Sequence, residues 1–573
     1  PNSSVTSYTL LMLGAVLGLQ RQLRRSASRH RAPTQRSLRS ITPAAASRVL
    51  LTGCVVLLVG FSVPSTPVAA MSRYQADEVI EEFWYRDPLE GKGYPQALDV
   101  FELNHRPAGR HGFLRAQGDT LVFADGTLAR FWGANIQARA LFDSDKASVQ
   151  RHARRLARLG FNLVRIHHHD SPWVSPNIFD RTGDDTLRLN ADSLARLDWW
   201  IHCLRQQGIY IWLDLHVERA ITAADNIQHF ADLAGEKEAA SLKGFNYVNA
   251  EIKAAMQAFN RAYLNHHNPY TGLRYRDDPA IVAGLITNEN DLTHHYGHRL
   301  LKKHAPWHRA QFTQAAANMA STMQIERDSL LDLWEPGPPA IFLNRLENNF
   351  NEDMLQHLRE LGFRAPLATT SSWGSMGLSS LPALAAGNFI DAHGYARGDQ
   401  FSLDPRSQTG LFHRLAAAQV SDKPFTVSEW NMQEFPATAR YQLPLYLASL
   451  GAFQGWDALV LYGYAQRPLN YQGPGDNWSS FRDPVLMALM PAAALLYRDH
   501  IAPARRHYRL RLPPATYFDK HIDADAAVAI RTLAEQSRIT IDLPYTETYP
   551  WLTEHPKTGK VTQLVRDHRR SFL

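Results

Sequence analysis

The segment Ile281–Asp291, IVAGLITNEND, decides the fold of this chain. It begins as a mainly apolar run, the pattern of a strand buried on both faces, and it ends in polar residues that include Asn288 and Glu289. Barrel enzymes keep their chemistry at the carboxyl ends of such buried parallel strands. The segment Pro424–Asn431, PFTVSEWN, has the same build and delivers Glu429. The two segments together predict a pair of carboxylates that face one substrate.

Strands of this kind alternate with predicted helices along most of the chain. Strands are expected at residues 127–135, 161–170, 209–217, 281–287, 365–371, 389–395, 424–431 and 458–464, and helices lie between them, for example at 148–159, 192–207 and 245–265. Eight strands, each followed by a helix, are typical of an α/β protein with a (β/α)8 TIM barrel.

The barrel is expected to carry an extension at each end. Before the first strand, GFLRAQ and LVFADG predict an N-terminal hairpin with a turn at Asp125–Gly126. After the last helix, RHYRLRLP and RITIDLP alternate polar and apolar residues and predict a small C-terminal β appendage. The expected organisation is a leader at 1–70, an extension with the hairpin at 71–130, the catalytic barrel at 131–499 and the β-rich region at 500–573.

The first 70 residues have the pattern of a targeting leader. Arg48 precedes an apolar run at 49–63, and a small-residue end at Ala70 follows, which is typical of a cleaved secretory signal. A secreted or periplasmic protein is therefore expected, and an uncleaved leader would anchor the chain to a membrane. An organelle transit peptide is the alternative, because the segment upstream is rich in Arg and Ser and contains no acid.

Charge and composition narrow the class of partner. The whole chain of 573 residues has a formal net charge of +6, but the leader contains eight Arg and no Lys, Asp or Glu, so the remainder carries −2. A faintly acidic body argues against a nucleic-acid partner.

Two cysteines, Cys54 and Cys203, cannot form a disulfide framework, and no segment after the leader is apolar enough to span a membrane. The sequence indicates no oligomeric state.

The polar residues at the eight strand ends are expected to share one pocket. Two carboxylates among basic and aromatic side chains suit a retaining glycosidase, in which one carboxyl group protonates the leaving oxygen and the other attacks the sugar. Aromatic rings would offer flat faces to the sugar. The candidates are Asn135, Arg165, His167, His169, Asp170, His216, Asn288, Glu289, Trp373, His393, Tyr395, Glu429, Trp430, Tyr462 and Tyr464.

The order of these motifs resembles glycoside hydrolase family 5, the cellulase-like members of a clan of (β/α)8 retaining glycosidases. The resemblance covers roughly residues 130–500 by motif order and strand count. It implies that Glu289 is the acid/base, that Glu429 is the nucleophile and that Asn288 contacts the sugar 2-hydroxyl. The other matching positions are Arg165 in LVRIH, His216 in LDLH and the pair His393 and Tyr395 in HGY. The strand-eight Trp of the family is not matched, since LVLYGYAQ places Tyr462 or Tyr464 there, which leaves the substrate class open.

Two alternatives to the glycosidase remain from the sequence. If the segment HHHD alternates as a strand, His167 and His169 share a face, and such a pair on a barrel strand suits a metal-dependent hydrolase. The further metal ligands of such barrels are not found at the expected strand ends, so no metal and no organic cofactor is predicted. An inactive barrel that only binds carbohydrate is the second alternative. A carbohydrate is the expected partner both of the glycosidase and of the inactive barrel.

Overall fold

The computed structural model describes residues 99–543, apart from 303–304, 334–336, 375–376, 399–400, 402, 438 and 512–527. The leader at 1–70 and most of the extension before the hairpin lie outside the described residues. Among the described residues, no helix is long and apolar enough to cross a membrane.

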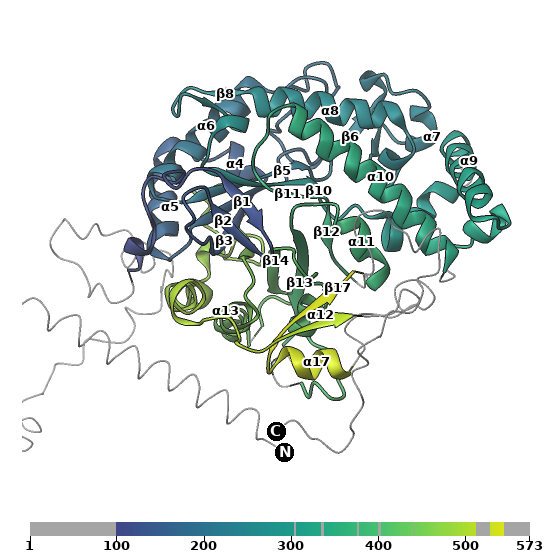
Figure 1. The fold of residues 1–573 in the computed structure, drawn as a ribbon. Coiled ribbons are helices and arrows are strands. Elements are labelled where there is room, and N and C mark those ends of the chain that lie inside the picture. The colour runs from purple at the N-terminus through teal and green to yellow at the C-terminus, as the bar shows by residue number, and fades with distance from the viewer. Residues whose placement is uncertain are drawn as a thin grey trace, which may run out of the picture. The chain divides into compact units, whose positions relative to one another are not determined.

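A closed parallel barrel forms the centre of the described chain (Figure 1). The short strands β11 and β12 lie at the two ends of the hydrogen-bonded order, but they are successive pieces of the same segment, so that segment closes the barrel. The eight-stranded (β/α)8 class is therefore confirmed. The strands are β3 (Phe131–Gln137), β4 (Leu163–His167), β5 (Tyr210–His216), β10 (Ile281–Thr287), β11 (Leu367–Ala368), β12 (Ser371–Ser372), β13 (Ile390–Ala396), β14 (Phe425–Met432) and β15 (Ala458–Ala465).

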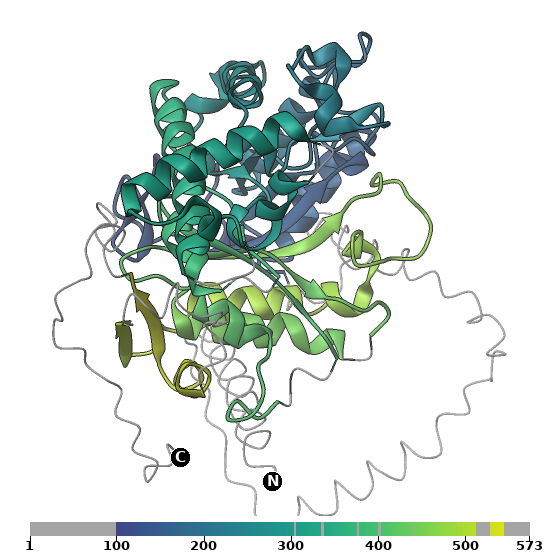
Figure 2. The same cartoon turned by 90° about the vertical axis from the view of Figure 1, so that its right-hand side faces the viewer.

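Helices surround this barrel, and most follow the predicted alternation (Figures 1 and 2). In α5, for example, the Asp145 side chain caps the first turn by accepting from the backbone N–H of Ser148 at 2.8 Å. The helices are α4 (Arg139–Phe142), α5 (Lys146–Arg158), α6 (Ala191–Gln206), α7 (Phe230–Ala234), α8 (Ala250–Asn265), α9 (Pro306–Met323), α10 (Pro338–Glu360), α11 (Leu381–Leu384), α12 (Leu411–Ala417), α13 (Leu443–Gln454), α14 (Pro484–Met487) and α15 (Met490–Leu495).

The hairpin lies below the barrel and pairs β1 (Leu114–Gln117) with β2 (Thr120–Phe123). Its tight turn is at Gly118–Asp119, whereas the expected turn at Asp125–Gly126 is a second one that leads toward the first barrel strand. The buried carboxylate of Asp457 joins hairpin and barrel, because it accepts from the backbone N–H groups of Leu121 at 2.8 Å and Phe425 at 3.0 Å.

Smaller strand pairs lie outside the barrel, among them the antiparallel pair β8 (His267–Asn268) and β9 (Leu273–Arg274). The insertion after β5 forms the antiparallel pair β6 (Ala220–Thr222) and β7 (Ala239–Ser241). The C-terminal region contains β16 (His507–Arg511), α17 (Val528–Ala534) and β17 (Arg538–Asp542), and its two strands are parallel. The helix was not expected from the alternating pattern; it packs on α12, as the lower part of Figure 1 shows.

Candidate active site

A cavity of about 680 Å³ opens at the carboxyl ends of the barrel strands. Its size is that of a site for a small molecule or a short stretch of polymer. Residues from seven barrel strands or the loops after them line it: His167, His168, Glu218, Asn288, Glu289, Trp373, His393, Tyr395, Glu429 and Tyr462, together with Lys243 from the insertion and Trp478.

Glu429 lies at the bottom of this cavity and has both carboxylate oxygens engaged. Arg165 donates to Oε1 at 2.8 Å and the Tyr395 hydroxyl donates to Oε2 at 2.6 Å. His393 Nδ1 is 3.5 Å from Oε2. Only 4% of the Glu429 side chain is exposed, so this carboxylate is held in one orientation by buried groups.

Glu429 points into the barrel because β14 contains a β-bulge. Pairing with β13 shifts between Val427 and Glu429, so Ser428 is the extra residue of the bulge. As a result, two successive side chains face the interior: the Ser428 hydroxyl contacts Asp391, and Glu429 contacts Arg165. Without the bulge, strict alternation would send one of the two outward.

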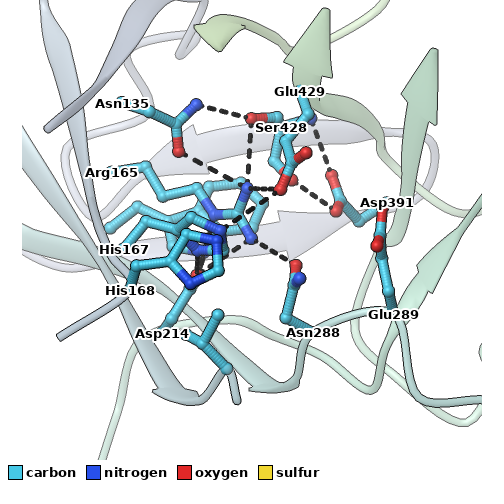
Figure 3. A network of polar contacts seen from close by, with 12 residues as sticks. Asn135, Arg165, His167, His168, Asp214, Asn288, Glu289, Asp391, Ser428 and Glu429 are labelled. Atoms are coloured by element: carbon cyan, nitrogen blue, oxygen red, sulfur yellow. Dashed lines mark hydrogen bonds and ion pairs between the residues drawn. The ribbon is translucent and has the colours of Figure 1, made fainter. Parts of the chain in front are cut away.

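Arg165 is fully buried beneath the cavity and joins several elements (Figure 3). Its Nε donates to Asp214 Oδ1 at 3.0 Å, and its Nη2 donates to Asn288 Oδ1 at 2.7 Å. Burial lowers the pKa of Arg165, but Asp214 and Glu429 outweigh burial and raise it. The guanidinium therefore stays charged and fixes Glu429 and Asn288 relative to each other.

Glu289 follows β10 and faces the cavity with a left-handed backbone angle, φ 45°. His393 Nδ1 lies 2.8 Å from Glu289 Oε1, and 24% of the Glu289 side chain is exposed. One carboxylate oxygen of Glu289 is within 4.8 Å of one of Glu429. That separation suits the direct attack of a retaining glycosidase, since inverting enzymes need roughly 6.5–9.5 Å to admit a water.

Of the histidines that line the cavity, His393 has the highest pKa. Burial lowers the pKa of His393, but Glu429, Asp391 and Glu289 outweigh it and raise the pKa to about 10. Burial raises the pKa of Glu289, but the hydrogen bond from His393 outweighs burial and holds it below the ordinary value. Burial raises the pKa of Glu429 against the opposing effects of His393 and Arg165. These opposite pKa shifts favour the proton between Glu289 and His393 on the His393 ring.

Aromatic side chains line the upper parts of the cavity. The Trp373 ring stacks on His295 with 3.8 Å between ring centroids, and its Nε1 donates to Asp291 at 3.0 Å. In the strand-eight position, Tyr462 contacts Trp478 edge-on with centroids 5.4 Å apart. Trp373 and Tyr462 are thus placed where the sequence predicted them, and each has an aromatic neighbour.

Five candidates from the sequence lie away from the cavity and contact other parts of the fold. His169 packs on Phe259 and Tyr263, because β4 ends at His167 and the left-handed backbone of His168 breaks the expected alternation. His216 is buried and bonded to Asn260, and the Asp170 carboxylate accepts from two backbone N–H groups. The Trp430 ring packs on Trp132, and the Tyr464 hydroxyl is bonded to His152.

One further candidate lies just below the cavity, and another lies in its wall. Asn135 is buried and donates to the backbone oxygens of Ser428 and Leu461. His167 lines the cavity, with Nε2 3.5 Å from Glu429 Oε1.

The sequence reasoning missed residues that support the site. Asp214 accepts from both Arg165 and His167, and Asp391 contacts Ser428 beside His393. Each is the single acid of a barrel strand and has apolar residues on both sides, and that pattern was the available signal. His168 and Lys243 also line the cavity, but no sequence pattern distinguishes them from surface residues.

Glu289, His393 and Glu429 form the one group of three potential metal ligands among the described residues. Both ring nitrogens of His393 already have hydrogen-bond partners, Glu289 at 2.8 Å and the Ser428 hydroxyl at 3.0 Å. A protonated imidazole has no lone pair for a cation. The group therefore suits proton transfer better than metal binding, and the predicted His167 and His169 pair does not form.

Comparisons with known proteins identify relatives whose sequences align with part of this chain. It is 28% identical over 196 residues to mannan endo-1,4-β-mannosidase F of Aspergillus fumigatus and 26% identical over 198 residues to a probable mannan endo-1,4-β-mannosidase F of Neosartorya fischeri. Each alignment covers 32% of this chain, which spans about two-fifths of the length of these curated relatives (40% and 38%). No protein-family model matches the chain.

Solved structures with a similar arrangement include an endo-1,4-β-mannanase from Rhizomucor miehei, with 16% identity, 67% of this chain and 99% of that chain covered, and a TM-score of 0.45. A GH5_18 protein from Bifidobacterium longum subsp. infantis has 13% identity, 74% and 94% coverage and a TM-score of 0.46. In the order of its motifs and in sequence, the chain resembles the clan of (β/α)8 glycosidases to which glycoside hydrolase family 5 belongs.

Proposed function

We propose that this protein is a retaining glycoside hydrolase that cleaves β-linked glycosidic bonds with Glu289 and Glu429. The single observation that carries the proposal is the approach of the two carboxylates within 4.8 Å at the mouth of the barrel. The similarity to mannan endo-1,4-β-mannosidases supports the same class of reaction.

The surroundings of the two carboxylates favour different roles. Glu429 is held at both oxygens beside the Arg165 cation, so it is the nucleophile that attacks the anomeric carbon. Glu289 is the more exposed of the two and would meet both the leaving oxygen and the incoming water. Glu289 then protonates the leaving group and afterwards activates water to hydrolyse the glycosyl-enzyme.

A β-1,4-linked mannan is the first substrate to test, because the curated relatives are named for it. β-Glucan, xylan and bacterial exopolysaccharides belong in the same panel, since the strand-eight position carries Tyr462 with Trp478. Proton NMR of the first product formed should show the β-anomer. Initial release of the α-anomer would contradict the retaining mechanism.

Substitution separates catalysis from binding. Glu429→Gln and Glu289→Gln should each lower kcat by about 10³-fold or more on an unactivated glycan, because each removes a reacting group. Glu434→Gln is the matched control, an exposed glutamate just after the same strand. Normal turnover in both active-site variants would exclude the proposal, whereas glycan binding without hydrolysis in the unmodified protein would favour the carbohydrate-binding barrel.

The metal-dependent alternative rests on the grouping of Glu289, His393 and Glu429. Dialysis against a chelator should leave the hydrolysis rate unchanged if the two carboxylates act alone. Loss of activity that Zn²⁺ or Mn²⁺ restores would instead support metal-assisted hydrolysis.

A further inference from the structure

Asp391 is a buried acid on β13, two residues before His393 and on the same face of the strand. It accepts from the Ser428 hydroxyl at 2.6 Å, the Ser428 backbone N–H at 3.0 Å and the Thr426 hydroxyl at 2.7 Å. Three donors therefore converge on this one carboxyl group, whose oxygens accept from each of them.

These contacts fix where the hydrogens lie. The Ser428 hydroxyl has a single proton, which it donates to Asp391, so its oxygen accepts from His393 Nε2 at 3.0 Å. His393 Nε2 therefore carries a hydrogen whether the ring is neutral or charged. The state of the ring then depends only on whether the proton between His393 Nδ1 and Glu289 Oε1, 2.8 Å apart, belongs to the nitrogen or to the oxygen.

We propose that Asp391 and Ser428 position His393 as a proton carrier for Glu289, so that the His393–Glu289 pair holds the single proton that the general acid needs. This inference rests on the proposed glycosidase function. In the transfer, the N–H bond at Nδ1 breaks and an O–H bond forms at Glu289 Oε1, leaving a neutral imidazole and a neutral acid. Glu289 gives that proton to the leaving oxygen and regains one from water in the second step.

The charged groups around His393 favour the protonated ring before transfer. From β14, Glu429 Oε2 lies 3.5 Å from Nδ1, and from β13, Asp391 Oδ2 lies 3.5 Å from Nε2. Arg165 and His167 of β4 face the same cluster; Arg165 is paired with Asp214 and Glu429, and burial lowers the pKa of His167, keeping its ring neutral. The net effect raises the pKa of His393 to about 10. When a sugar excludes water, the ion pair between His393 and Glu289 becomes less favourable against the neutral pair that results from transfer.

The experiment is nitrogen NMR of ¹⁵N-histidine-labelled protein without substrate, with the His393 signals assigned by comparison with His393→Gln. In the wild type, both ring nitrogens of His393 should be protonated at pH 7. Asp391→Asn removes the charge that holds the imidazolium and should move its titration downward by about one pH unit or more. A neutral His393 at pH 7 in the wild type, or unchanged signals in Asp391→Asn, would overturn the proposal.

Kinetics provide a readout that a structural role would not change. Asp391→Asn should lower kcat by about 10- to 100-fold on a glycan whose leaving oxygen needs a proton, with little change in KM. On a glycoside with a dinitrophenolate leaving group, which departs without protonation, the same variant should lose much less of its kcat. An equal loss on both substrates would show that the variant merely damages the site.

Two more variants keep the test decisive. Ser428→Ala breaks the link to Nε2 without removing the charge of Asp391, and it decides the matter if Asp391→Asn does not fold. Asp198→Asn is the matched control, because Asp198 is also a buried acid bonded to a histidine, His266, at 2.9 Å but lies outside the cavity. If no glycoside is hydrolysed, the proposed function fails, while the NMR signals still report on the proton carrier.

Discussion

Arg165 neutralises two buried carboxylates, Asp214 and Glu429, and its orientation depends on both. Asp214 also contacts His167 and the indole N–H of Trp212, so one acid orients three side chains below the cavity. A buried cation of this kind is stable only while its partners remain, since isolated buried charge is costly.

Replacing Asp214 by Asn tests this dependence at the scale of one residue. We expect kcat to fall by about 100-fold, because Arg165 would shift and move Glu429 from its position of attack. The free energy of unfolding should fall by about 3 kcal/mol, as when other buried ion pairs are broken. Steady-state kinetics and thermal unfolding measure the two effects. Asp198→Asn is again the control, and unchanged kcat in Asp214→Asn would contradict the role given to Asp214.

Trp373 supports a second residue-scale prediction. Trp373→Ala should raise KM by about 10-fold with little change in kcat, because a lost aromatic stacking contact is typically worth about 1 kcal/mol or more. Trp199→Ala is the control, a half-buried indole on α6 that packs on Tyr270. A lower kcat at unchanged KM would show that Trp373 acts on the reacting groups and not on binding.

Single residues also show how far the sequence could predict the site. Glu289, Glu429, Arg165, His393 and Tyr395 converge, because each lies at the end of a strand whose direction the apolar pattern reveals. The misplaced candidates failed for local reasons. Trp430 and Tyr464 face the helices, because strand alternation near the cavity is interrupted, and His216 is bonded to a neighbouring helix.

At the scale of elements, the bulge in β14 is the feature that the sequence could not reveal. PFTVSEWN has no Gly to mark a bulge, yet Ser428 is left without a partner in the ladder with β13. Bulges are set by pairing with a neighbouring strand, which is a tertiary contact. The α10 helix begins at Pro338, and prolines occupy its first turn, where proline is favoured.

The segment after Glu289 depends on a buried acid of α10. Glu347 accepts from the Leu292 backbone N–H at 2.9 Å, and its Oε1 has no hydrogen-bond partner among the described residues. Burial and the neighbouring Asp291, which also binds Trp373, raise the pKa of Glu347 to about 8. Folded protein therefore keeps this proton up to about pH 8, whereas the unfolded chain loses it near pH 4.5.

A pH dependence of stability follows from that difference. The stabilising effect of the proton is complete below about pH 4.5 and is lost as the pH rises toward 8, at up to about 1.4 kcal/mol per pH unit. Glu347→Gln cannot ionise, so its melting temperature should exceed that of the wild type at pH 8.5 by more than at pH 5. If the melting temperatures of the two proteins instead change in parallel between pH 5 and pH 8.5, Glu347 is already ionised in the folded state.

At the scale of the whole molecule, the apolar pattern alone was enough to predict the barrel. Eight buried strands with intervening helices admit few other arrangements, because a parallel strand order needs helical crossovers. The C-terminal region was less predictable, since its two strands pair in parallel around α17 and their register depends on contacts with the barrel helices. Val420 bridges to Ile541, and the Ile541 N–H bonds to the backbone oxygen of Gln419 at 2.8 Å.

Gln454 at the end of α13 links this C-terminal region to the barrel. Its fully buried amide donates to the backbone oxygens of Ala534 and Ser537, both at 2.6 Å, and accepts from the Ile539 N–H at 3.1 Å. Gln454→Ala leaves these backbone groups without partners, at a cost of about 1–3 kcal/mol for each that water cannot reach. We expect one cooperative thermal transition at a lower temperature, with KM unchanged, because the region packs on the barrel and unfolds with it. The exposed Gln356 of α10, replaced by Ala, is the control. A separate early transition that leaves the main one in place would mean that the C-terminal region folds independently of the barrel.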